Sequence, residues 1–221
     1  MRSELFAQEN LPKQSNERYL LQNSQTLRIG LGPDVLAAKG SMIAYRGNVS
    51  FEHESAGSIG KLAKKIVTSE NLSLMRVSGQ GEVYFAEQAG YINLMHLENE
   101  GISVNARNLL AFDTTLQWDI NRTKGAGMMS GGLFNTTLGG TGTVAIVAVG
   151  LVTVLDCSQG PVYVDSDAAV CWSANLSPTV QSSMSARSLI RGGSGEALQQ
   201  VFSGPGFVVV QAYEWAPVPT S

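Results

Sequence analysis

Short apolar segments, rich in β-branched residues and separated by glycine or polar turns, recur along the whole chain. In residues 91–97 successive side chains would lie on alternate faces of a half-buried strand. Residues 144–155 are almost wholly apolar and are interrupted at Gly150, which predicts two consecutive core strands. Residues 19–29 predict two more strands, separated by a polar pair. The pattern therefore predicts an all-β protein.

Two segments show helical spacing instead. Residues 58–67 place Ile59, Leu62 and Ile66 on one face, which predicts a short amphipathic helix that covers one end of a sheet. Contact of this helix with a membrane surface or a partner is the alternative. Residues 195–202 predict a second short helix before the last strand.

The clearest feature of the chain is a five-residue pattern, G-x-G-x-V, at residues 79–83, 140–144 and 204–208. The first glycines are 61 and 64 residues apart (140 − 79 and 204 − 140). Each copy follows an apolar residue and leads into an apolar, β-branched segment. A period of this length indicates internal structural repeats.

A second mark supports the same period. It consists of a small residue, an aromatic residue directly after it, and an aliphatic residue four positions after the aromatic one. The aromatic residues, which we call the aromatic marks, are Tyr45, Phe112 and Trp172. Residues 90–95 also align with residues 150–155 at an offset of 60 (150 − 90). Several matches at similar spacing indicate a common module.

We therefore expect a single domain over residues 1–221, built from three pseudo-repeats with pseudo-threefold symmetry. The predicted repeats are residues 15–57 completed by 200–216, residues 72–120, and residues 133–180. The first repeat has its aromatic mark without a preceding G-x-G-x-V, and the third G-x-G-x-V has no aromatic mark after it. The N- and C-terminal strands would thus complete one module, with residues 207–215 beside residues 19–45 and the sheet edges closed.

Composition narrows the class of protein. The 221 residues are 43% hydrophobic and 15% charged, which is typical of a folded, sheet-rich chain and not of a disordered one. The net charge of −3 provides no general attraction to nucleic acid or to anionic membranes. No transmembrane segment is predicted, since a span needs about 20 apolar residues. Residues 1–18 lack a secretory-signal pattern, so a cytoplasmic location is expected.

Candidate chemistry is sparse. His53 lies between two glutamates with no second histidine or cysteine near it in sequence, which predicts a solvated strand end. His96 falls at a different point of the repeat, and neither histidine forms the His-x-His typical of cupin metal sites. Cys157 and Cys171 are expected to be buried thiols, with a disulfide or redox pair as the alternative. We predict no catalytic, cofactor-binding or metal-binding residues, no cofactor and no enzyme activity.

Several turns only superficially resemble ligand loops. Residues 30–34 are followed by no helix pattern, so a turn is expected rather than a phosphate loop. Residues 98–101 and 165–167 are also expected to be turns, the latter because the rest of a calcium-loop spacing is missing. The G-x-G pairs precede strands, so bends or bulges with positive φ explain all three copies better than phosphate binding. Gly81→Val and Gly142→Val are therefore expected to damage folding.

Three passages together carry a resemblance to a known family. They are residues 38–42 (AKGSM), residues 131–144 (from GGLF to GTGTV) and residues 195–211 (GEALQQVFSGPGFVVVQ). Over residues 15–215 the chain resembles the altered-inheritance-of-mitochondria protein 24 family, with departures at Ser41 and Ala197, where that family often has glycine. The resemblance implies three repeats, each like a subunit of the tryptophan-sensing RNA-binding attenuation protein, a short relative of the double-stranded β-helix. It supplies no catalytic residues, and the mitochondrial members are linked to inner-membrane organisation.

Three functions are compatible with these observations. A non-catalytic interaction or scaffold protein, with an unknown protein partner or by self-association, is favoured because the modules are similar, charges are few and no catalytic group stands out. The alternative is a small-molecule or RNA binder that uses clefts between the β modules. Tyr45, Phe112 and Trp172 could stack bases, but their apolar neighbours favour core packing, and no basic stripe accompanies them. A cupin-like enzyme is least favoured.

Overall fold

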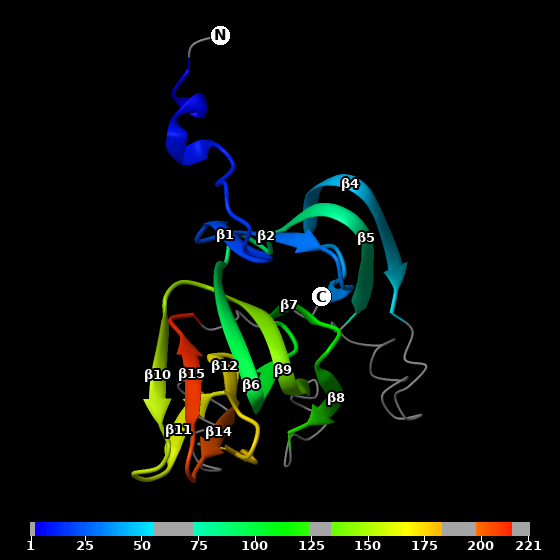
Figure 1. Cartoon of the computed structure of the whole chain (residues 1–221). Coiled ribbons are helices and arrows are strands. Elements are labelled where there is room, and N and C mark those ends of the chain that lie inside the picture. The colour runs from blue at the N-terminus through cyan, green and yellow to red at the C-terminus, as the bar shows by residue number, and fades with distance from the viewer. Residues whose placement is uncertain (1–2, 55–72, 124–133, 183–197, 214–221) are drawn as a thin grey trace, which may run out of the picture.

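The computed structural model describes residues 3–54, 73–123, 134–182 and 198–213. Two short 3₁₀ helices, η1 (Glu4–Phe6) and η2 (Gln8–Asn10), precede a long series of β-strands (Figure 1). The strands are β1 (Tyr19–Asn23), β2 (Thr26–Leu31), β3 (Val35–Ala38), β4 (Met42–His53), β5 (Leu74–Phe85), β6 (Tyr91–Asn105), β7 (Leu109–Asp113), β8 (Gln117–Arg122), β9 (Phe134–Ala148), β10 (Val152–Asp156), β11 (Val162–Asp165), β12 (Ala169–Ser173), β13 (Thr179–Ser182), β14 (Leu198–Phe202) and β15 (Phe207–Gln211). The predicted all-β class is confirmed.

Most strands form one antiparallel sheet, in the order β1-β2-β5-β3-β7-β9-β6-β12-β15-β10, with β4 paired to β5 and β8 to β9. A smaller sheet has the order β11-β14-β13. Three long strands, β5, β6 and β9, change partners along their length. Because each half of such a strand belongs to a different pairing, the strands curve strongly, as the arched pair β4 and β5 shows in Figure 1.

All three G-x-G-x-V copies pair with earlier strands in one common register. The residues after the second glycines are Glu82, Thr143 and Phe207, and they lie opposite Gly30, His96 and Asp156, respectively. The valines that follow are Val83, Val144 and Val208, and they lie opposite the aromatic marks Tyr45, Phe112 and Trp172, respectively. The two sequence marks are therefore neighbours across strands in every copy.

These pairings group the strands into three units, and in each unit the G-x-G-x-V copy belongs to the last strand. We call them unit 1 (residues 19–85), unit 2 (residues 91–148) and unit 3 (residues 152–211). Unit 1 consists of a first strand formed by β2 and β3, a second strand β4 and a third strand β5. In unit 2 the first strand is β6, the second is formed by β7 and β8, and the third is β9. In unit 3 the three strands are formed by β10 with β11, β12 with β13, and β14 with β15. Pseudo-threefold symmetry and the likeness to the attenuation protein stay predictions.

The expected pairing between the chain ends is wrong. Strand β15 pairs with β10 and β12 of its own unit. Residues 19–45 pair instead with one another, with β5 and with β7. The N- and C-terminal strands therefore do not complete one module. Pairing inside a unit closes shorter loops than pairing across the whole chain, which lowers its entropic cost.

Neighbouring units are joined by a recurring strand pairing. In the first joint β3 of unit 1 pairs with β7 of unit 2, with Leu36 opposite Phe112. In the second joint β6 of unit 2 pairs with β12 of unit 3, with Ser103 opposite Trp172. Both joints use the later half of a first strand and the beginning of the next unit's second strand.

The first glycine of each G-x-G pair has a backbone conformation that favours glycine. The first glycine of each pair has a positive φ, which is 110° at Gly79, 116° at Gly140 and 121° at Gly204. Gly81 and Gly206 also have positive φ, at 146° and 155°. Residues with side chains rarely adopt these conformations, which accounts for glycine here. The expected positive φ is confirmed at the first glycine of every copy, but Gly79 and Gly140 lie inside strands β5 and β9, and only Gly204 lies between two strands.

Strand β7 lies at the centre of the core. All five of its residues are buried. Leu110 and Ala111 pack in an apolar cluster supplied mostly by unit 1, whereas Leu109 and Phe112 pack in a second cluster supplied mostly by unit 2. A strand that is covered on both faces is held rigidly. Asp113, at its end, is therefore fixed in position.

Local predictions differ from the structure in two places. Residues 198–202 form strand β14 and not a helix, because pairing with β11 and β13 overrides the local pattern. The turn expected at residues 98–101 is a bulge inside β6, where Asn99 has a φ of 60°. Asparagine tolerates this left-handed conformation, so the strand continues past it. The helix predicted at residues 58–67 lies outside the described residues.

Candidate functional site

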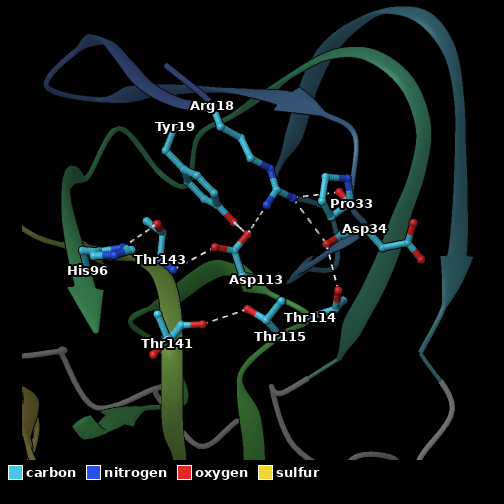
Figure 2. Close-up of polar contacts among 10 residues, drawn as sticks. All are labelled: Arg18, Tyr19, Pro33, Asp34, His96, Asp113, Thr114, Thr115, Thr141 and Thr143. Atoms are coloured by element: carbon cyan, nitrogen blue, oxygen red, sulfur yellow. Dashed lines mark hydrogen bonds and ion pairs between the residues drawn. The ribbon is translucent and has the colours of Figure 1, made fainter. Parts of the chain in front are cut away.

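A buried carboxylate lies at the end of β7, next to the first joint between units. Asp113 is 7% exposed and accepts three hydrogen bonds (Figure 2). Arg18 Nη1 and the Tyr19 hydroxyl donate to Oδ1 at 2.6 and 2.9 Å. The Thr143 backbone N–H donates to Oδ2 at 2.8 Å. We call these four residues the Asp113 junction.

Arg18 extends the junction to the connection between β2 and β3. Its Nη2 donates to the Pro33 carbonyl at 2.7 Å, and its guanidinium carbon lies 5.5 Å from the centre of the Tyr19 ring. The Thr114 hydroxyl donates to the Asp34 carbonyl at 3.0 Å (Figure 2). Unit 1 and unit 2 are thus held together by side chains as well as by strand pairing.

The junction is suited to structure and not to proton transfer. Burial and the adjacent Asp113 carboxylate raise the pKa of Tyr19 well above its ordinary value, so the phenol stays protonated and donates. The Asp113 charge is balanced by Arg18 at 2.6 Å. A buried pair with such additional hydrogen bonds fixes chain segments, and removal of one partner leaves the other charge uncompensated.

The corresponding position has a similar role in unit 3. Asp113 directly follows the aromatic mark of unit 2, and Ser173 directly follows that of unit 3. Ser173 Oγ accepts the Phe207 N–H at 3.1 Å, just as Asp113 accepts that of Thr143. This side chain therefore satisfies a backbone donor beside the G-x-G bend in both units.

Unit 1 has an ion pair at this position. Arg46 follows its aromatic mark and contacts Glu82 Oε2, while Arg28 Nη1 lies 3.0 Å from Glu82 Oε1. The side chain of Arg28 is 9% exposed and that of Arg46 is 72% exposed. The hydrogen bond from Arg46 is the main cause that lowers the pKa of Glu82 below its ordinary value.

We expect Glu82→Gln to lower the free energy of unfolding at pH 7 by about 1 kcal/mol, because Arg46 is exposed and solvent screens its share. The pKa of Glu82 is depressed in the folded protein, so its contribution is full above the ordinary value of 4.5 and disappears as the pH falls through the folded pKa. Urea unfolding of both proteins between pH 7 and pH 3 checks this. A difference in stability that stays constant over the whole range contradicts it.

Neither histidine belongs to a metal cluster among the described residues. His53 is the last residue of β4 and is exposed, as predicted. His96 is also exposed, and its Nδ1 lies 3.3 Å from the Thr143 hydroxyl (Figure 2). Within residues 3–54, 73–123, 134–182 and 198–213, no three or more His, Cys, Asp or Glu side chains gather as metal ligands would.

The aromatic marks differ in burial. Phe112 and Trp172 are 0% and 2% exposed, so their predicted core packing is confirmed. Tyr45 is 52% exposed, so the same prediction is wrong for it. Phe112 and Trp172 are covered by the strand that joins them to the preceding unit, whereas Tyr45 has no such neighbour among the described strands.

The two cysteines are free and buried, which confirms the expectation of buried thiols. Burial raises the pKa of Cys171 to about 12. At neutral pH this side chain is therefore a protonated thiol that packs as a small apolar group.

In the part of the chain that the structure describes, six strands (β1, β4, β8, β10, β11 and β13) have one unpaired edge, and two of them, β4 and β11, carry an exposed tyrosine. Strand β4 pairs there only with β5, and β11 only with β14. Ile43 and Tyr45 on β4 are 57% and 52% exposed, and Tyr163 on β11 is 59% exposed. We call β4 residues 42–46 and β11 the open edges. Unpaired backbone next to exposed apolar side chains is typical of an interaction surface.

The Asp113 junction was not identified from the sequence. Arg18 and Asp113 are 95 positions apart, and no local motif connects them. The one available signal is the residue that follows each aromatic mark. That position holds Arg46, Asp113 and Ser173, which share no chemistry, so the signal has no obvious functional meaning.

The fold and these contacts define an antiparallel β protein in which buried polar groups join successive units. The chain belongs to the family described as Mitochondrial biogenesis AIM24, which matches residues 19–213. The resemblance found in the sequence is thereby confirmed.

Two comparisons with individual proteins agree with this assignment. The uncharacterized protein M6_Spy0233 of Streptococcus pyogenes serotype M6 is 24% identical over 194 residues, which cover 82% of this chain and 77% of that protein. The crystal structure of protein SPYM3_0169 from Streptococcus pyogenes matches with a TM-score of 0.71 at 23% identity. That match covers 89% of this chain and 92% of the other, and it supports the fold.

None of the helices in the described ranges is long and apolar enough to cross a bilayer.

Proposed function

We propose that this chain is a non-catalytic interaction module that binds protein partners through the open edges of its two sheets. The observation that carries the proposal is the exposure of Ile43, Tyr45 and Tyr163 on strands with one unpaired edge. An edge strand offers backbone donors and acceptors to an added strand, and apolar side chains beside it supply burial.

The polar groups of the molecule support this proposal. Asp113 binds one arginine and Glu82 binds two. Arg76 lies 3.0 Å from Glu54 and 3.3 Å from Asp34. These groups connect strands to one another, which is a structural role. A cytoplasmic location stays a prediction.

Photo-crosslinking in the native host tests the proposal. The photoreactive residue p-benzoylphenylalanine replaces Tyr45 or Tyr163 in separate experiments, and Phe6 serves as the control because it is an exposed aromatic outside the sheet, at 57%. We expect discrete protein adducts from the Tyr45 and Tyr163 positions and none from the Phe6 position. Adducts that consist of RNA or a small molecule would overturn the proposal in favour of the binder alternative. Absence of adducts at both edge positions would overturn it as well.

A further inference from the structure

The two joints inside the chain share one register. They place Leu36 opposite Phe112 and Ser103 opposite Trp172. Leu36 and Ser103 also occupy the same position in their own units, because each faces the residue three positions before the first glycine of G-x-G. Those facing residues are Arg76 and Thr137, respectively (79 − 76 and 140 − 137). The joint is therefore one defined geometry that occurs twice.

The open edges carry the two halves of a third joint. Tyr163 on β11 faces Val201, which is also three positions before the first glycine of its unit (204 − 201). Tyr45 on β4 faces Val83, as the aromatics of the two existing joints face their own valines. Strand β11 thus corresponds to the donor half of a joint, and the beginning of β4 corresponds to the acceptor half.

The two halves do not meet within one chain. Figure 1 shows β4 and β11 at opposite ends of the molecule, with unit 2 between them. No pairing joins them among the described strands. Another molecule is therefore needed to complete the joint.

We propose that β11 of one copy adds to β4 of a second copy, head to tail, with Tyr163 opposite Tyr45 and Val164 opposite Ala44. This inference rests on the proposed interaction function and names its partner. The arrangement is heterologous, so the copies form a closed ring or an open filament according to the rotation between them.

Burial at the existing joints shows what this contact would do. The aromatics Phe112 and Trp172 are 0% and 2% exposed, whereas Tyr45 and Tyr163 are 52% and 59% exposed. Cross-strand aromatic pairs are favourable, and covering both rings removes apolar surface from water. Each existing joint pairs three residues with three. Within one chain the two halves of a joint are held close together, which gives them a high effective concentration. Two separate molecules lack this advantage, so association through so short a joint is expected to depend on protein concentration.

A pair of single-cysteine additions tests the register. Tyr45→Cys is made in one protein and Tyr163→Cys in another, because directly opposite residues of antiparallel strands are within reach of a disulfide. The native Cys157 and Cys171 are buried, so the unsubstituted chain is the background control. Under mild oxidation we expect about tenfold more crosslinked dimer in the mixture than in either variant alone. A mixture of Tyr45→Cys with Leu151→Cys is the positional control, since Leu151 is 75% exposed and lies outside both open edges.

Sedimentation velocity over a concentration series provides the second measurement. We expect the unsubstituted chain to associate as concentration rises, and Tyr163→Glu to remain monomeric with an unchanged melting temperature. A monomer at all concentrations, or equal crosslinking with the Leu151 control, would overturn the proposal. An intramolecular disulfide in the dilute double variant Tyr45→Cys/Tyr163→Cys would also overturn it, because the joint would then close within one chain.

Failure of this inference can be told apart from failure of the proposed function. If copies do not associate but photo-crosslinking at Tyr45 captures a different protein, self-assembly is overturned and the interaction function stands. If neither experiment yields a protein adduct, both are overturned.

Discussion

Gly81→Ala is expected to lower the free energy of unfolding by about 3 kcal/mol or more. Gly81 has a φ of 146°, which side-chain-bearing residues rarely adopt. A Cβ at this position would overlap the carbonyl oxygen of Arg46 on the paired strand β4. That atom belongs to the backbone of a strand pair, so the clash is relieved only by separating β4 from β5. Urea unfolding monitored by circular dichroism measures the loss.

Gly32→Ala is the matched control for this variant. A Cβ at Gly32 meets nothing within 4 Å, so we expect a change of no more than about 0.5 kcal/mol. Equal unfolding midpoints for Gly81→Ala and Gly32→Ala would contradict the prediction. Gly142→Val is expected to be milder than Gly81→Val, because a Cβ at Gly142 first meets side-chain atoms of Thr115 and Leu116.

Asp113→Ala is expected to cost about 3 kcal/mol of stability. The variant removes the acceptor for Arg18, for the Tyr19 hydroxyl and for the Thr143 N–H in one step. The partly buried guanidinium of Arg18 would lose its counter-charge at the joint between units 1 and 2. Thermal and urea unfolding provide the measurement.

The control for this variant is Asp119→Ala, since Asp119 is exposed and accepts a hydrogen bond only from the neighbouring Ile120 N–H among the contacts described. It is expected to cost no more than about 0.5 kcal/mol. A double-mutant cycle with Arg18→Ala should give a coupling energy above about 1 kcal/mol. If Asp113→Ala is as stable as the control, Asp113 does not fix the joint.

The strand content was accessible from the sequence, but the arrangement of the strands was not. Alternation and glycine breaks correctly predicted separate strands in residues 19–29 and a break at Gly150. The prediction that both strands around Gly150 belong to the core is wrong for β10, where Val154 is 63% exposed. The three G-x-G-x-V copies also pair in one common register. A period, however, does not say where a repeat begins. Residues 207–211 therefore could be assigned equally well to the N-terminal strands or to unit 3, and only the pairing of β15 decides.

The same limit applies to the candidate sites. Tyr45, Phe112 and Trp172 have equivalent sequence surroundings, yet Tyr45 is exposed because the strand that covers the other two has no counterpart beside β4 in the described chain. The Asp113 junction depends on residues that meet only after units 1 and 2 have joined. Both features arise from the relation between units, which local patterns do not encode.

The order of pairing along the chain has a consequence for synthesis on the ribosome. Each joint connects a unit to the one that follows it in sequence, through β3 with β7 and then β6 with β12. A nascent chain can therefore complete one unit before the next emerges, and each new unit covers the edge left by its predecessor. The growing molecule always carries one uncovered donor strand at its newest end. In unit 3 that strand is β11.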